Sequence, residues 1–207
     1  TVIIGGGVVG LSTAYNLAKK GMDEIVVLER EYLGSGATGR CGAGIRQQWG
    51  TEMNCKLARK SMDIFEDMNE LLETEMDIEL KQQGYLLLAF SEKEMEQFRK
   101  NLKLQSRENI PSREVSPAEA KEIVPHLNID DVVGGTFCPT DGHANPFLVV
   151  KAYADAAERL GVEINTFTEA VDIIQEDGEI TGVQTDKGLI ATDKVVNTAG
   201  GYACQIG

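Results

Sequence analysis

Three glycines and one carboxylate near the start of the chain have the spacing of a dinucleotide-binding site. Gly5, Gly7 and Gly10 form the pattern G-x-G-x-x-G. In this pattern the first glycine permits a tight turn, the second lets the backbone approach a pyrophosphate, and the third allows a close approach of helix and strand. Glu29 follows at about the 20-residue separation at which an acid binds the adenosine ribose. The alternative is a glycine-rich turn that holds no ligand.

The elements around these residues are the ones that the motif requires. The apolar run 2–4 predicts a strand, residues 11–20 predict a helix that ends before Gly21, and residues 24–28 predict a second strand ending at Glu29. A helix that starts at the turn directs its free N–H groups and the positive end of its dipole at the phosphates. The order strand, turn, helix therefore favours a bound dinucleotide.

A second group of chemically capable residues follows a glycine-rich loop. Residues 33–44 are mostly small, so the loop can lie flat against a ligand and offer backbone N–H donors. The loop runs directly into Arg46, two glutamines and Trp49, the only tryptophan of the chain. A flexible glycine-serine linker is the alternative, but a linker does not require these side chains.

Capping signals predict the helices in the middle of the chain. Thr51 precedes a predicted helix over about 52–72. Ser91 and Ser116 are each followed three residues later by glutamate, which is the pattern of a capping box. Because the stretch 76–140 has strands and helices of its own, we interpret it as part of a substrate domain inserted between 1–75 and 141–207, the two parts of the nucleotide-binding domain.

The last part of the chain returns to the nucleotide-binding pattern. Asn145 predicts the cap of a helix over about 146–160, and two turn signals divide residues 171–191 into a β-meander. A final strand over 194–197 ends in a second glycine turn, 198–201. This turn either brings backbone close to a ligand or simply ends the strand.

Composition excludes several classes of function. The chain has 207 residues and a net charge of −13, which argues against nucleic acid as a partner. It has no apolar run of about 18 residues, so no membrane span is predicted. Four scattered cysteines without C-x-x-C disfavour zinc and suit a reducing cytoplasm. The chain begins almost inside its first strand, so we expect a few upstream residues.

The chain resembles the FAD-dependent D-amino-acid oxidase superfamily, and within it the β subunits of heteromeric sarcosine oxidases and of dye-linked L-proline dehydrogenases. The stretch GSGATGRCGAGIRQQW at 34–49 carries the most specific part of the resemblance. The other matching stretches are VIIGGGVVG at 2–10, VVLER at 26–30, QQGYLLLAF at 82–90, PTDGHANPF at 139–147 and VVNTAGGYA at 195–203.

The resemblance implies a fold and a cofactor. The fold would be α/β, with a Rossmann-like FAD-binding domain of the glutathione-reductase type and an inserted α+β substrate domain. Family members are longer, so we expect a chain truncated at the C-terminal side, without the rest of the substrate-domain sheet and a late glycine loop. Some related β subunits attach FMN through a histidine near the helix that starts at 146. Here Asn145 precedes that helix and His143 lies earlier, so covalent attachment is not transferred, and FMN at a subunit interface stays open.

The resemblance also implies roles for single residues. Those implied to bind FAD are Gly5, Gly7, Val8, Val9 and Gly10 at the pyrophosphate, Glu29 at the adenosine ribose, Arg30 beside the adenine, Ser35 and Thr38 near the pyrophosphate, Gly42, Ala43 and Gly44 along the isoalloxazine, Val171 at the adenine, and Ala199 and Gly200 over the cofactor. Arg46 matches an arginine that binds the substrate carboxylate, a planar group that suits the arginine fork. A surface position or a contact with an FAD phosphate is the alternative for Arg46.

These roles predict an FAD-dependent enzyme that oxidises the C–N bond of an amino acid. The substrate would be a secondary or N-methyl amine, such as sarcosine, dimethylglycine or proline, and a hydride would pass to the flavin. Oxygen or a carrier would take the electrons, and other subunits would complete a heteromeric complex. The alternatives are a flavin dehydrogenase of a hydroxy acid or glycerol phosphate, a non-catalytic flavin-holding subunit, and an NAD-dependent dehydrogenase.

Overall fold

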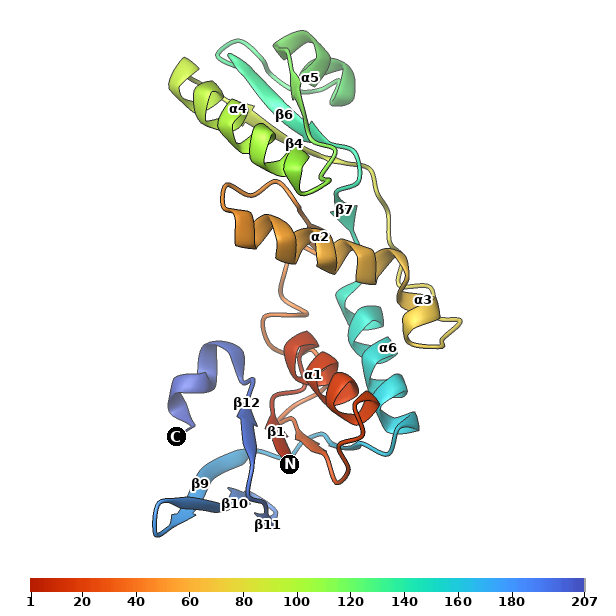
Figure 1. The fold of residues 1–207 in the computed structure, drawn as a ribbon, viewed down its shortest axis with the longest axis vertical. Coiled ribbons are helices and arrows are strands. Elements are labelled where there is room, and N and C mark those ends of the chain that lie inside the picture. Colours follow the sequence, from red (N-terminus) through yellow and green to blue (C-terminus); the bar gives the residue numbers. More distant parts are fainter. Residues whose placement is uncertain (207) are drawn as a thin grey trace. The chain divides into compact units, whose positions relative to one another are not determined.

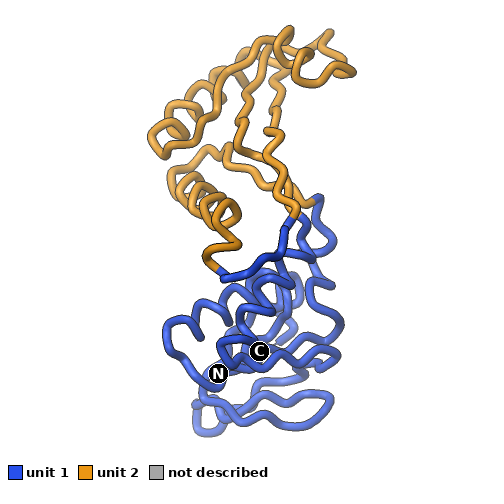
Figure 2. The backbone as a smooth tube through the Cα atoms, turned by 90° about the vertical axis from the view of Figure 1, so that its right-hand side faces the viewer, with its two compact units in different colours: residues 1–42, 72–78, 145–207 blue, residues 43–71, 79–144 orange. Residues whose placement is uncertain are grey.

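The computed structural model describes residues 1–206, which divide into two compact units (Figure 2). Unit 1 contains residues 1–42, 72–78 and those from 145 onward, and unit 2 contains residues 43–71 and 79–144. The sequence interpretation assigned residues 43–71 to the first part of the nucleotide-binding domain. They belong to unit 2 because their helix α2 (Glu52–Glu66) packs against α4 (Glu92–Arg107) of that unit.

A parallel sheet of four strands forms the centre of unit 1 (Figure 1). Its order is β12-β1-β2-β8, and Ile3 of the first strand lies between Val196 and Val27. Parallel neighbours cannot be joined by a tight hairpin, so α1 crosses over between β1 and β2. The bounds of these elements are β1 Val2–Ile4, α1 Val8–Lys19, β2 Val26–Leu28, β8 Glu163–Asn165 and β12 Val195–Asn197.

Two helices lie side by side in unit 1, α1 and α6 (Pro146–Arg159), and they cover one face of the sheet. Tyr15 of α1 and Tyr153 of α6 meet edge to face, with ring centroids 5.9 Å apart. The Asn145 side chain accepts a hydrogen bond from the backbone N–H of Phe147, and so caps α6 as predicted. The cap fixes where the chain re-enters unit 1.

An antiparallel meander packs on the opposite face of the parallel sheet. It consists of β9 (Ala170–Glu176), β10 (Glu179–Thr185) and β11 (Gly188–Ala191). Val2 and Ile4 form an apolar cluster with residues of the meander. Side chains alternate between the two faces of a strand, so Ile3 points to the helices instead. The result is three layers: helices, parallel sheet and meander.

Unit 2 is built around an antiparallel sheet of three strands in the order β4-β6-β5. Helix α4 packs on all three strands and α5 packs on β5 and β6. A separate two-stranded ribbon pairs β3 with β7. The bounds are β3 Gly44–Ile45, α3 Met68–Leu71, β4 Tyr85–Ala89, β5 Arg113–Val115, α5 Pro117–Ile123, β6 Gly134–Cys138 and β7 Gly142–His143.

Two predictions about α2 are wrong. The helix predicted over 52–72 ends at Glu66, and a separate short helix α3 follows Asp67. The last turn of α2 has no basic residue and carries acidic ones, which the negative end of the helix dipole disfavours. Thr51 makes no side-chain capping hydrogen bond. Glu52 lies in the first turn, where its charge suits the dipole without a cap.

The two predicted capping boxes differ in the structure. At Ser116 the box is complete: its Oγ accepts from the Glu119 N–H at 3.2 Å, and the Glu119 carboxylate accepts from the Ser116 N–H at 2.8 Å. Ser91 Oγ also accepts from the Glu94 N–H, at 3.3 Å, but the Glu94 carboxylate accepts from Phe90 instead. The complete box therefore stabilises the start of α5 from both directions.

Replacing Ser116 with alanine is expected to lower the free energy of unfolding by about 1 kcal/mol, because it leaves a helix N–H without its acceptor. The matched control is Thr51→Ala, which removes a hydroxyl that caps nothing and should change stability by less than about 0.5 kcal/mol. Urea unfolding of both variants measures the difference. Equal losses in the two variants would contradict the capping assignment.

The stabilisation by this cap depends on pH. Hydrogen bonds from Ser116 hold the pKa of the Glu119 carboxyl below its usual range. A lowered pKa in the folded state contributes stability above the ordinary glutamate pKa, and this contribution is lost as the pH falls through the lowered value. The stability gap between the wild type and Ser116→Ala should therefore narrow in acid.

Candidate functional site

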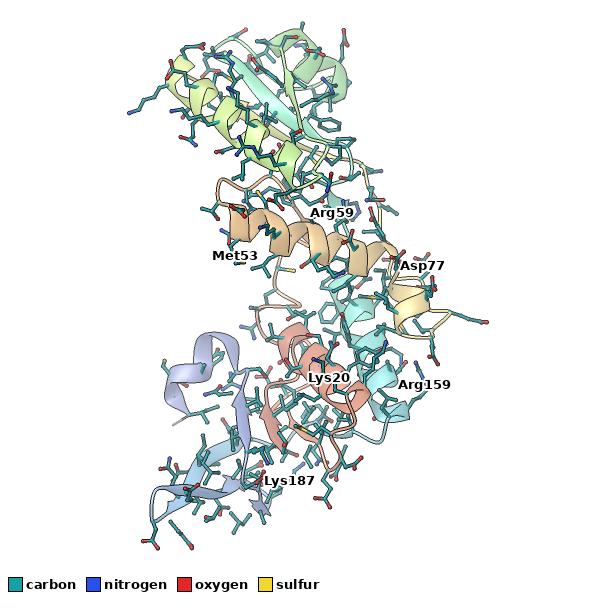
Figure 3. All side chains as sticks on the ribbon, in the orientation of Figure 1. Lys20, Met53, Arg59, Asp77, Arg159 and Lys187 are labelled. Atoms are coloured by element: carbon teal, nitrogen blue, oxygen red, sulfur yellow. The ribbon has the colours of Figure 1, made fainter. Side chains whose placement is uncertain are left out.

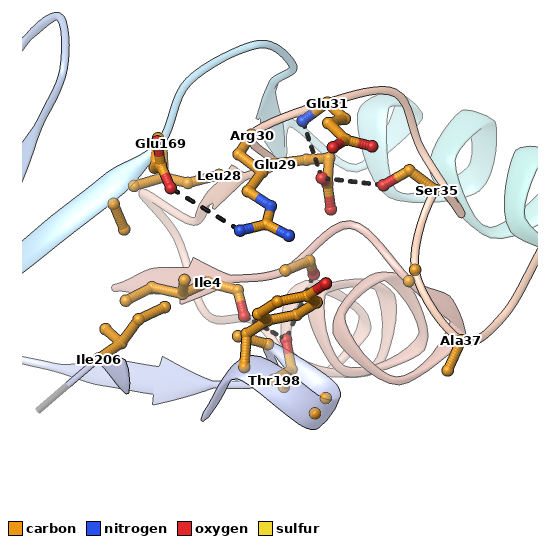
Figure 4. A pocket seen from close by; sticks show the side chains of 18 of the residues that line it. Ile4, Leu28, Glu29, Arg30, Glu31, Ser35, Ala37, Glu169, Thr198 and Ile206 are labelled. Carbon is orange, nitrogen blue, oxygen red and sulfur yellow. Dashed lines mark hydrogen bonds and ion pairs between the residues drawn. The ribbon is translucent and has the colours of Figure 1, made fainter. Parts of the chain in front are cut away.

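A pocket of about 630 Å³ lies in unit 1 where β1, β2 and β12 end (Figure 4). This is the edge at which parallel α/β sheets bind ligands. Ten of the residues predicted to bind FAD line it: Gly5, Gly7, Val9, Glu29, Arg30, Ser35, Thr38, Val171, Ala199 and Gly200. Segments far apart in the sequence thus converge on one cavity.

Close packing explains why the turn after β1 contains glycine. A Cβ on Gly10 would lie 1.9 Å from the carbonyl oxygen of Gly5. A Cβ on Gly5 would lie 2.5 Å from the carbonyl oxygen of Thr198, and its φ of +113° disfavours any other residue. Thr198 Oγ1 donates to the Ile4 carbonyl at 2.7 Å and so ties β12 to this turn. The turn can therefore approach a ligand with bare backbone.

The start of α1 offers hydrogen-bond donors at this turn. The first N–H groups of a helix have no acceptor within the helix, and the N-cap residue Gly7 has no side chain to supply one. Thr38 Oγ1 accepts from the Val8 N–H at 3.2 Å. The exposed Val9 side chain faces the pocket. The remaining donors and the positive end of the dipole fit a pyrophosphate.

Glu29 is held rigidly at the end of β2. The residue is 9% exposed. One carboxylate oxygen accepts from the Gly6 N–H at 2.8 Å, and the other accepts from the Glu31 N–H at 2.9 Å and from Ser35 Oγ at 3.3 Å. A carboxylate has about four acceptor positions, so capacity for a further donor remains. A ribose hydroxyl of FAD fits that capacity.

Arg30 and Tyr202 form a flat wall of the same pocket. The Arg30 guanidinium lies 4.0 Å from the centre of the Tyr202 ring and forms an ion pair with Glu169 at 3.8 Å (Figure 4). Tyr202 comes from the short 3-10 helix η1 (Gly200–Gln205) that follows the second glycine turn. A planar wall of this kind suits a planar nucleotide base.

Replacing Glu29 with glutamine is expected to weaken FAD binding about tenfold, equivalent to about 1.4 kcal/mol, because an amide cannot accept from both Gly6 and Glu31 while also binding a ribose. Glu31→Gln is the matched control, since the Glu31 carboxylate accepts no hydrogen bond within residues 1–206. Flavin fluorescence quenching during titration of the full-length apoprotein measures both affinities. Equal effects of the two variants would contradict the role of Glu29.

Arg46 lies in unit 2, immediately after β3. Its guanidinium stacks 4.5 Å from the centre of the Trp49 ring, and Trp49 Nε1 donates to the Arg46 carbonyl at 3.0 Å. In the described part of unit 2, no carboxylate lies within ion-pair distance of this guanidinium. The side chain is half-buried. Its charge is therefore free to bind an anion.

The remaining predicted residues lie outside the pocket lining. Val8 and Gly10 belong to α1, where Gly10 shapes the turn from behind. Gly42 is exposed at the end of the first segment of unit 1. Ala43 has a φ of +60°, an uncommon conformation for alanine, and Gly44 starts β3. The roles of these residues stay predictions.

Sequence reasoning missed several residues. It gave Asp141, within the matching stretch 139–147, no role, but Asp141 is fully buried against the glutamines that follow Arg46. It also passed over Tyr202 and Thr198 in the pocket. An acid between Thr140 and a glycine gives no periodic signal. For Thr198, the apolar strand that ends in glycines could have indicated a position at the pocket.

The described residues support neither a cysteine nucleophile nor a metal site. Burial raises the pKa of the Cys138 thiol and of the Cys55 thiol, so both stay protonated near neutral pH and are poor nucleophiles. Within residues 1–206, no three His, Cys, Asp or Glu side chains are grouped so as to hold a metal ion. No helix in that range combines the length and apolar character needed to cross a bilayer.

Comparison with known proteins identifies the family. The family model described as DAO, FAD dependent oxidoreductase, matches residues 1–207. The chain therefore belongs to the FAD-dependent oxidoreductase family of the D-amino-acid oxidase type. The family resemblance, the α/β fold and FAD as the cofactor, each predicted from the sequence, are thereby confirmed.

Similar proteins include enzymes and one regulatory subunit. The crystal structure of L-proline dehydrogenase from P. horikoshii is 40% identical, with a TM-score of 0.91, over 99% of this chain and 54% of that chain. Sarcosine oxidase subunit beta of Rhodobacter capsulatus is 29% identical over 98% of this chain. The mouse mitochondrial pyruvate dehydrogenase phosphatase regulatory subunit is 33% identical over 100% of this chain.

This chain spans 50% of the length of that sarcosine oxidase subunit and 23% of the length of the phosphatase subunit. It therefore corresponds to part of each of these relatives.

Proposed function

We propose that the protein is an FAD-dependent oxidoreductase that oxidises the C–N bond of an amino acid, with a secondary or N-methyl amine of the sarcosine, dimethylglycine or proline type as substrate. The observation that carries this proposal is the guanidinium of Arg46. It is half-buried, stacked on Trp49 and not compensated by a carboxylate of its own unit. The names of similar enzymes, L-proline dehydrogenase and sarcosine oxidase, support the same class of substrate.

In this proposal each residue has a binding or orienting task. FAD supplies a ring that accepts a hydride. Arg46 binds the substrate carboxylate through two parallel N–H···O bonds, and the Trp49 ring, whose centre lies 4.5 Å from the guanidinium, supports the arginine side chain. Gly42, Ala43 and Gly44 are proposed to run along the flavin ring.

The proposal assigns the pocket of unit 1 to the rest of the cofactor. The glycine turn and the first residues of α1 bind the pyrophosphate, and Ser35 and Thr38 line the same region. Glu29 binds the ribose, Arg30 and Val171 contact the adenine, and the segment at Ala199 and Gly200 closes over the cofactor.

A second candidate function is a non-catalytic, flavin-holding subunit. The observation that favours it is the 33% identity to a protein named as a regulatory subunit, which is no lower than the 29% identity to the sarcosine oxidase subunit. Because the same fold serves different functions, activity has to be measured on the whole protein.

We also propose partner subunits and a compartment. One similar protein is named as a β subunit, which supports a heteromeric complex. A location in the cytoplasm rests on the cysteine pattern, and within residues 1–206 none of the four cysteines forms a disulfide. Activity assays in air and with an artificial dye as acceptor would identify whether oxygen or a carrier takes the electrons.

The test is the visible absorption spectrum of the full-length protein during anaerobic addition of substrates. Flavin bands that bleach with sarcosine or L-proline support the proposal, and pyrrolidine, which lacks the carboxylate of proline, should bleach them far more slowly. Bleaching by lactate or glycerol 3-phosphate alone would move the assignment to a dehydrogenase of hydroxy compounds. Bands that survive every substrate, with or without partner subunits, would favour the non-catalytic subunit.

A further inference from the structure

The backbone on both sides of Arg46 is attached to one short segment of unit 2. On the N-terminal side, β3 pairs with β7, so that Ile45 lies opposite Gly142. On the C-terminal side, the Gln47 N–H donates to the Asp141 carboxylate at 2.9 Å. Residues 141–143 therefore hold the single residue between these two attachments, which is Arg46.

Asp141 is the centre of this attachment. It is fully buried, and its carboxylate also accepts from Gln47 Nε2 at 3.1 Å and from Gln48 Nε2 at 3.3 Å. A buried charge is costly unless hydrogen bonds compensate it, so these bonds hold the two glutamines strongly. Asp141 does not touch the Arg46 guanidinium, and any effect it has on Arg46 passes through the backbone.

The two glutamines extend the network to the sheet and to α2. The Gln48 amide donates to the Tyr85 carbonyl at 2.8 Å and accepts from Thr136 at 2.7 Å. Gln47 Oε1 accepts from Arg59 of α2 at 2.9 Å. Figure 3 labels Arg59 on this helix. Both glutamines are buried, so their orientations are fixed by these partners.

The far side of the Arg46 side chain is fixed as well. Trp49 lies against the guanidinium, and the Trp49 carbonyl accepts from Gln105 Nε2 at 2.9 Å. The loop from Arg46 to Trp49 is therefore anchored at each residue that follows the arginine. An arginine whose side chain is preorganised in this way loses little conformational entropy when it binds a planar anion.

We infer that Asp141 is the positioning residue for Arg46: its buried carboxylate, bonded to Gln47 and Gln48, fixes the loop so that the guanidinium is preorganised for a substrate carboxylate. This inference rests on the proposed function, in which Arg46 binds that carboxylate. It assigns Asp141 no contact with the substrate or the flavin. Its effect must therefore depend on the presence of both the arginine and a carboxylate.

The experiment is a titration of the full-length, FAD-loaded protein with 2-furoate, a planar carboxylate without an oxidisable C–N bond, followed by the visible flavin spectrum. The neutral 2-furamide is the matched probe that lacks the charge. The variants are Asp141→Asn, Arg46→Met and the combination of both. Ser116→Ala is the control, since it destabilises unit 2 at a site outside the network.

Asp141→Asn is expected to weaken 2-furoate binding about tenfold, because the asparagine amide group opposes the Gln48 donor. It should leave 2-furamide binding and FAD content unchanged. In the Arg46→Met background, the same substitution should change 2-furoate binding less than about twofold, because residues that act through one another are not additive. Ser116→Ala should lower the unfolding temperature without changing either affinity.

Each other outcome decides against one of the claims. If Arg46→Met leaves 2-furoate binding unchanged, the proposed function fails. If Arg46→Met weakens it and Asp141→Asn does not, only the positioning inference fails. If Asp141→Asn weakens the binding of 2-furamide as much as that of 2-furoate, Asp141 has a merely structural role. The same conclusion follows if Asp141→Asn weakens 2-furoate binding equally with and without Arg46. If Asp141→Asn does not fold, Gln47→Met removes the side-chain bond to Asp141 and takes its place in the same comparison, with an expected loss of about threefold.

Discussion

Replacing Gly10 with alanine is expected to abolish FAD binding and to destabilise unit 1. The new Cβ would lie 1.9 Å from the backbone oxygen of Gly5, and a backbone atom cannot move aside as a side chain can. Overpacking of this kind costs about 1–3 kcal/mol or more. Because α1 would have to move away from the turn, its N–H groups would no longer face the pyrophosphate. FAD retention through gel filtration and thermal unfolding of the apoprotein measure the two effects.

Gly36→Ala is the matched control for stability. Gly36 lines the pocket, has no positive φ, and its Cβ would meet no atom within 4 Å. The apoprotein carrying this change should unfold at the temperature of the wild type. A Gly10→Ala protein that retains FAD at the wild-type level would show that the turn after β1 does not bind the pyrophosphate.

Replacing Arg46 with methionine is expected to lower kcat/KM for an amino-acid substrate by about 10²- to 10³-fold. Hydrogen bonds to charged groups contribute about 1.5–3 kcal/mol each, and a bidentate pair accounts for about 3–4 kcal/mol. Each 1.4 kcal/mol corresponds to about a factor of ten. Methionine keeps an unbranched apolar stem in place of the arginine methylenes, while the guanidinium and its contact with Trp49 are removed.

The carboxylate-free substrate pyrrolidine provides the internal comparison, since its already slow oxidation should not change in Arg46→Met. Arg99→Met is the matched variant: Arg99 lies in unit 2 but is paired with Glu92 and Glu114, so its charge is already compensated. Its steady-state kinetics should equal those of the wild type. Equal losses with proline and pyrrolidine would contradict a carboxylate-binding role.

Local spacing was sufficient to predict the strand, turn and helix at the start of unit 1. The G-x-G-x-x-G turn, Glu29 and the helix caps all depend on residues close in sequence, and their conformational requirements are visible in the residue types. Gly5 illustrates this, since its positive φ and the crowding at its Cβ leave no other choice. The last strand was predictable because an apolar run ended in glycines.

The surroundings of Arg46 could not be predicted in the same way. Asp141 and Gln47 lie 94 residues apart in sequence, so no local pattern relates them. The strands β3 and β7 contain two residues each, which is too short for a periodicity. At Thr51 the sequence predicted a cap that the structure does not have, because a suitable cap residue need not form the capping hydrogen bond.

The pairing of β1 with β12 has a consequence for how the protein is made. Val2 lies beside Val195, and the second wall of the pocket follows at Thr198, so residues 2–198 must all leave the ribosome before the pocket is complete. At synthesis rates of about 5–20 residues per second, β1 and α1 wait on the order of ten seconds or more for β12. All of unit 2 emerges during that interval and can fold first. The pocket of unit 1 is therefore complete only in chains in which β1 and β12 have paired.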